Sequence, residues 1–146
     1  MPMKDFTFHC FDLTFKVEMV DAWGGSVGLS RADTLEIRID RNAAEGVQKI
    51  TLLHEFLHLV SYLFALNLPE TQVSFIGVVL PRHWPLCFVP SEERITSCLR
   101  ECEVSGQFEL STSSRAALAA ALCALSTESP EVFNLMFSRR AANVDG

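Results

Sequence analysis

The chemistry-bearing residues of this chain gather in segment 50–64, ITLLHEFLHLVSYLF, where His54, Glu55 and His58 stand among apolar residues. In a helix, residues four apart share one face at about 6 Å along the axis, so both imidazoles can bind one Zn²⁺ ion. Glu55 falls on the adjoining face, where its carboxylate could accept a proton from a zinc-bound water. The spacing predicts metal-activated hydrolysis, with His54 and His58 as metal ligands and Glu55 as general base.

Apolar residues surround these three polar groups at nearly every helical position, which predicts a helix buried on all sides. An ionised carboxylate buried without a partner costs several kcal/mol, so one shared partner is expected to compensate the three groups. A divalent cation would do this. The alternative is a pair of core histidines bonded to backbone or carboxylate groups. The apolar positions are Ile50, Leu52, Leu53, Phe56, Leu57, Leu59, Val60, Tyr62, Leu63, Phe64 and Leu66.

The stretch HEFLH matches the HExxH motif of zinc metallopeptidases. Together, TLEIRID, a short spacer, QKITLLHEFLHLVSY and LPETQV resemble the small metallopeptidase-like proteins of bacteriophages and bacteria. Those proteins are related in outline to the ImmA/IrrE and SprT-like minimal zincins, in which a strand precedes the motif helix. The resemblance is specific over residues 34–73. It implies a zincin-like fold, bound zinc and a protein or peptide substrate.

The sequence leaves the third metal ligand open. In such zincins the helix after the motif commonly supplies an acidic ligand, whereas the matching position here is Ser74. Glu70, twelve residues beyond His58 in the first turn of the next helix, could fold back on the site. Its alternative role is a favourable interaction with a helix N-terminus. The remaining candidates are Glu92, Glu93, His83, Glu101 and Glu103.

Glu92 or Glu93 could complete a site of two histidines and one glutamate from the start of a later helix. His83 has ligand chemistry, but a loop histidine beside Trp84 is more often a surface or packing residue. A peptide substrate could add as a strand along an edge of the sheet. The candidates for stabilising a tetrahedral oxyanion are His83, Tyr62 and Arg82.

Strands are expected before the motif helix. Segments 5–10, 13–19 and 34–40 alternate apolar and polar residues, and Trp23–Ser26 supplies a turn between the last two. Residues 1–41 are therefore expected to form a small antiparallel sheet of three or four strands.

Helices follow over residues 42–140. The motif helix, capped by Asn42 or Asp40, is expected to reach about Leu66, and a second helix should run from Pro69 to Pro81, where a loop to Pro85 begins. Without repeats or a long linker, residues 1–146 are predicted to form one α+β domain. Further helices are expected at 90–103, 111–125 and from 129, with a frayed end at 141–146.

Composition agrees with one domain, because 146 residues with 49% hydrophobic and 21% charged suffice for a single core. The net charge of −6 and the scattered basic residues argue against a nucleic-acid partner. Neither a secretory signal nor an apolar run of about 20 residues is present, so a cytoplasmic protein without a membrane partner is expected. Five cysteines without a framework pattern suit a reducing compartment, and Cys98 and Cys102 are expected in the core.

Two other functions compete with a zinc peptidase. A zincin scaffold that has lost its third ligand could be a catalytically inactive interaction module of the phage type, using segment 81–107 for contact. The stretch HEFLHLVSY also resembles the metal motif of YbeY-type endoribonucleases. However, Phe64 stands where that motif needs a third His, and Glu55 where it needs Gly.

Overall fold

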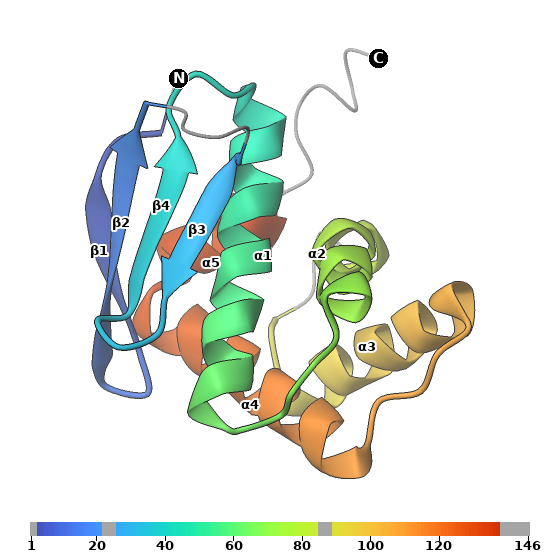
Figure 1. The fold of residues 1–146 in the computed structure, drawn as a ribbon. Coiled ribbons are helices and arrows are strands. Elements are labelled where there is room, and N and C mark those ends of the chain that lie inside the picture. Colours follow the sequence, from blue (N-terminus) through green and yellow to red (C-terminus); the bar gives the residue numbers. More distant parts are fainter. Residues whose placement is uncertain (1–2, 22–25, 85–88, 138–146) are drawn as a thin grey trace.

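Strands precede helices in the computed structural model, which describes residues 3–21, 26–84 and 89–137 (Figure 1). This order confirms the predicted α+β class, with a motif helix and four further helices in the described ranges. The predictions for residues 23–25, for position 85 at the end of the loop and for the frayed C-terminus lie outside those ranges. The strands are β1 (Phe6–Cys10), β2 (Leu13–Val20), β3 (Gly28–Arg31) and β4 (Glu36–Asp40). The helices are α1 (Glu45–Leu63), α2 (Glu70–His83), α3 (Glu92–Gly106), α4 (Thr112–Glu128) and α5 (Pro130–Phe137).

The sheet has the order β1-β2-β4-β3 and is mixed. β1 with β2 and β3 with β4 are antiparallel, but β2 and β4 are parallel, with Val17 opposite Ile37. The predicted all-antiparallel sheet was wrong at this pair. The chain leaves β2, forms the outermost strand β3 and returns as β4 between them. Apolar alternation specifies the face that a strand buries, not its neighbour, so the sequence pattern could not show this insertion.

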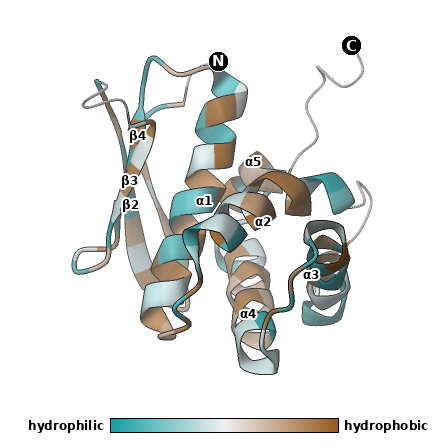
Figure 2. Ribbon diagram, turned by 45° about the vertical axis from the view of Figure 1, so that its right-hand side comes forward, coloured by the Kyte–Doolittle hydropathy of each residue, from teal (hydrophilic) through white to brown (hydrophobic). Residues whose placement is uncertain are grey.

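One face of the sheet carries the core. Phe8 and Phe15 stack with ring centroids 5.0 Å apart, and both rings pack against Phe56 of α1. The opposite face is polar, with Glu18 paired to Lys16 and to Arg38. Helix α1 lies across β3 and β4, α4 packs against β1, and α2 and α3 form a layer beyond α1 (Figures 1 and 2).

Helix α1 starts and ends within the predicted segment. It begins at Glu45, and its N-cap Ala44 offers no side-chain hydrogen bond, so the predicted caps at residues 40 and 42 were wrong. Instead, the side-chain amide of Gln48 donates to the backbone oxygens of Asp40 and Arg41 at 3.1 and 3.2 Å. These two bonds tie the start of α1 to the end of β4.

The prediction that α1 is buried on all sides was wrong. Leu53 and Leu57 are fully buried, but Ile50 is 41% and Tyr62 is 62% exposed. Val47, Ile50 and Tyr62 lie on one stripe along the helix. Apolar composition alone cannot distinguish a side chain that faces the core from one that lines an open cleft.

The later helices follow their predicted signals closely. Ser91 and Ser111 cap α3 and α4, each with its hydroxyl accepting a backbone N–H at 3.2 or 3.0 Å. Helix α2 continues through Pro81 to His83, so the predicted loop begins later than expected. Pro81 has no backbone N–H to donate, and α2 ends two residues after it. Within the described ranges, no helix has both the length and the apolar content needed to cross a membrane.

Candidate metal centre

Helix α1 presents His54 and His58 from its exposed stripe. Their Nε2 atoms lie 3.1 Å apart, as the spacing of four residues predicts, and their side chains are 20% and 29% exposed. Both rings are therefore held by a buried helix while their Nε2 atoms reach an open cleft. This placement allows both imidazoles to bind one ion from solvent.

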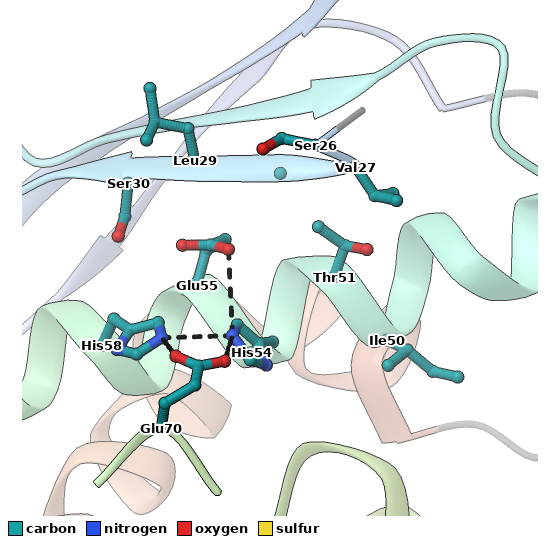
Figure 3. A pocket seen from close by; sticks show the side chains of 11 residues that line it. Ser26, Val27, Leu29, Ser30, Ile50, Thr51, His54, Glu55, His58 and Glu70 are labelled. Atoms are coloured by element: carbon teal, nitrogen blue, oxygen red, sulfur yellow. Dashed lines mark hydrogen bonds and ion pairs between the residues drawn. The ribbon is translucent and has the colours of Figure 1, made fainter. Parts of the chain in front are cut away.

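Glu70, from the first turn of α2, completes the group. Its Oε1 lies 2.7 Å from Nε2 of His58, and its Oε2 lies 3.0 Å from Nε2 of His54 (Figure 3). The three ligand atoms lie within 4.8 Å of one another, so this group could hold a metal ion. The hydroxyl of Ser74 donates to Oε2 of Glu70 at 3.0 Å. Ser74 thus orients a carboxylate that stands one helical turn before it.

A compact link between α1 and α2 brings Glu70 to the histidines. Ala65 and Asn67 adopt left-handed backbone conformations, with φ of 52° and 54°. The hydroxyl of Ser61 accepts the backbone N–H of Leu68 at 3.1 Å. Asn67 was a usable sequence signal, because asparagine tolerates this conformation, but the role of Ser61 left no local pattern.

The charge and spacing of the group suit a cation. Partial burial raises the pKa of Glu70, but the hydrogen bond from Ser74 and the charges of His54 and His58 outweigh it and lower the pKa below its ordinary value. Tetrahedral zinc with bonds near 2.0–2.1 Å needs ligand atoms about 3.3 Å apart. The observed separations of 2.7 to 3.1 Å need to widen by only a few tenths of an ångström. Two imidazoles and one carboxylate also match zinc in donor chemistry.

Glu55 lies beside the group without belonging to it. Its carboxylate is 4.0 Å from Nε2 of His54, and the residue is only 8% exposed. Gly28 of β3 faces this carboxylate, since a Cβ built on Gly28 would lie 3.3 Å from Oε2 of Glu55 and would collide with Cγ2 of Thr51. Gly28 therefore lets β3 approach α1 closely. Gly28 was not among the predicted site residues, although a glycine inside a strand often marks such an approach.

A cleft of about 590 Å³ opens between β3 and α1 over this group (Figure 3). On its strand side, Gly28 and Ser30 stand in register with Ile39 and Ile37 of β4, which are fully buried. The strand that borders the cleft thus has small residues at the positions whose partners on β4 are buried isoleucines. The lining residues are Ser26, Val27, Gly28, Leu29, Ser30, Ile50, Thr51, His54, Glu55, His58 and Glu70.

The other candidate third ligands lie elsewhere. Glu92 and Glu93 stand in the first turn of α3, and Nδ1 of His83 pairs with Glu101 at 3.3 Å. Among the described residues, none of these joins a group of three metal-ligating side chains. Tyr62 and Arg82, which were candidates for the oxyanion, do not belong to the cleft lining given above.

The remaining candidates have roles in packing. They are Glu103, Cys98 and Cys102. Both carboxylate oxygens of Glu103 accept hydrogen bonds from Arg115, at 2.8 and 2.7 Å, and Oε1 also accepts the N–H of Leu110. Arg115 lowers the pKa of Glu103. Cys98 and Cys102 are buried, as expected from the sequence, and burial raises the pKa of Cys102 to about 12.

Comparisons with models of protein families, with curated proteins and with solved structures give no match. The resemblance to minimal zincins therefore rests on the sequence of residues 34–73. The structure shows a narrower result, which is that His54, His58 and Glu70 could together hold a metal ion.

Proposed function

We propose that this chain is a zinc-dependent metallopeptidase in which His54, His58 and Glu70 bind zinc and Glu55 is the general base. The observation that carries the proposal is the group of three ligand atoms within 4.8 Å, open to a cleft, with a fourth carboxylate beside it. Catalytic zinc sites commonly have three protein ligands and keep one position open. The two carboxylates thus have separate roles, since Glu70 contacts both imidazoles and Glu55 does not.

Zinc in this site would supply a Lewis acid that polarises a carbonyl group and lowers the pKa of water. Glu55 accepts a proton from the attacking water, whose oxygen forms a bond to the carbonyl carbon. Glu55 then gives this proton to the leaving nitrogen as the C–N bond breaks. The products are one carboxylic acid and one amine, so Glu55 returns to its starting state.

The strand β3 suits the binding of an extended peptide. It is the last strand in the sheet order, and within the described residues no strand pairs with its other edge. A peptide could add there through backbone hydrogen bonds, which would hold a carbonyl group above the metal group. The low exposure of Glu55, 8%, would shield proton transfer from bulk water.

Metal content and cleavage, measured on the same variants, test this function. The purified protein should contain one zinc per chain and cleave members of a peptide library, as read by mass spectrometry. His54→Ala should lose the zinc, whereas Glu55→Gln should keep it and lose cleavage. Glu92→Gln is the matched control, because this carboxylate on α3 lies outside the metal group. Protein prepared without chelator that contains no metal would refute the proposal.

A second outcome of the same experiment would distinguish a peptidase from an inactive interaction module. Protein that binds zinc through His54, His58 and Glu70 but cleaves nothing in the library would favour an inactive interaction module. The original reason for that alternative was a lost third ligand. Glu70 weakens this reason, because it lies within 3.0 Å of both histidines.

A further inference from the structure

The cleft has an apolar end beside His54. Ile50 stands four residues before His54 on the same stripe of α1, and Val47 continues the stripe. These two side chains are 41% and 42% exposed. Val27 of the strand side lies at the same end of the cleft and is 37% exposed (Figure 3). Apolar side chains on both walls of one end can gain stability only when a ligand covers them.

The opposite end of the cleft, beside His58, is polar. Ser30 points from β3 toward the cleft, and Glu70 closes the side facing α2 (Figure 3). Ser30 is in register with Ile37 of the neighbouring strand β4, and Ile37 lies in the core. A small hydroxyl residue at this position leaves space for a polar side chain but offers little apolar surface.

Between the two ends, the strand side has no side chain at Gly28. A peptide backbone can therefore pass close to β3 at the level of Glu55 while its side chains reach the two ends. Ile50 and His58 are eight residues apart on α1, about 12 Å along its axis, so an extended peptide that rises about 3.3 Å per residue spans the two ends with about four residues. The peptide segments on the two sides of the scissile bond thus meet different surroundings.

We infer that the cleft selects peptides with one bulky apolar residue within about two residues of the scissile bond, seated against Ile50 and Val27. The residues on the other side of the bond, near Ser30 and His58, are small or polar. The inference rests on the proposed peptidase function and assigns its substrate class. Covering a Leu or Phe side chain on such a wall corresponds to binding about tenfold tighter than for Ala.

Peptide hydroxamates test this preference without requiring turnover, because the hydroxamate anchors on zinc. Two series would carry Leu, Phe, Ala or Asp on one side or the other of the metal-binding group. With zinc-loaded protein, calorimetry should show Leu and Phe binding about tenfold tighter than Ala in one series, and no such gain in the other. Ile50→Ala should reduce this gain severalfold. Val104→Ala is the control, because Val104 on α3 is 80% exposed and lies outside the cleft.

The outcomes separate this inference from the proposed function. Zinc-loaded protein that binds all side chains equally, or whose preference is unchanged by Ile50→Ala, overturns the apolar subsite and leaves the metal site standing. Equal gains for Leu and Phe in both series overturn the asymmetry. Protein that takes up no zinc in the preceding metal analysis overturns both the function and the subsite.

Discussion

Gly28→Ala should destabilise the fold, because the added methyl group has no space where β3 packs against α1. The added Cβ would collide with Cγ2 of Thr51 and lie 3.3 Å from Oε2 of Glu55. Thr51 cannot easily rotate away, because its hydroxyl donates to the backbone oxygen of Val47 at 2.7 Å. The strand must move outward or this hydrogen bond must break, so the mutation reports directly on the closeness of the two elements.

Two opposing contributions determine the expected change in the free energy of unfolding. Overpacking of a tight contact costs about 1–3 kcal/mol. Replacing glycine by alanine at a compatible backbone position returns roughly 0.5–1 kcal/mol through the unfolded chain. The net loss for Gly28→Ala is about 0–2.5 kcal/mol, with a middle value of about 1 kcal/mol. Thr51→Ser removes Cγ2 but keeps the hydroxyl, so Gly28→Ala should cost less in that background, with a coupling of about 1 kcal/mol or more.

Urea unfolding of the four proteins of this double-mutant cycle, with chelator present to exclude metal effects, measures the coupling. Gly46→Ala is the matched control, because a Cβ at Gly46 meets no atom within 4 Å. It should be neutral or slightly stabilising. The reasoning fails if Gly28→Ala is as stable as Gly46→Ala, or if the effects of Gly28→Ala and Thr51→Ser are additive.

Four further results are expected. Ser74→Ala removes the hydrogen bond to Glu70 and should weaken zinc binding about 10–100-fold in chelator competition, while an unchanged affinity would contradict the role of Ser74. Arg115→Met leaves Glu103 buried without its partner and should cost about 3–5 kcal/mol in urea unfolding at pH 7. Because Arg115 lowers the pKa of Glu103, the pair stabilises fully above the ordinary carboxyl pKa and loses this stabilisation as pH falls through the lowered value, so the difference from Glu103→Gln should shrink in acid. Burial raises the pKa of Cys10 to about 12, so iodoacetamide should not label Cys10 in the native protein at pH 8, as read by peptide mass spectrometry.

Local signals in the sequence were sufficient for most elements of the fold. The alternating Phe8, Phe15 and Ile37 predicted strands with one buried face, and Ser91 and Ser111 predicted helix starts. The parallel pairing of β2 with β4 could not be predicted, because it depends on contacts between distant segments that share the same alternation. The actual start of α1 is accompanied by two side-chain hydrogen bonds from Gln48 to backbone oxygens seven and eight residues earlier, and no capping pattern in the sequence indicates them.

The candidate site was partly predictable for a similar reason. Helical spacing placed His54 and His58 together, since it depends on one regular element. Glu70 remained one candidate among several, because its approach depends on a link whose shape rests on left-handed residues and on Ser61. Ile50 was predicted to lie in the core, and it instead lies at the cleft. An isoleucine is equally apolar in the core and at the cleft, and only the position of β3 decides which of the two places Ile50 occupies.

The three proposed ligands come from parts of the fold that open at different free energies. His54 and His58 belong to α1, whose neighbouring Leu53 and Leu57 are fully buried, so these ligands separate only when the domain unfolds. Glu70 stands in the first turn of α2, with its side chain 64% exposed and no side-chain cap on that turn. Fraying of this turn would detach one ligand and leave the other two in place. Opening of this single turn would then be the first step of zinc release, and hydrogen exchange at the start of α2 would report the free energy of that opening.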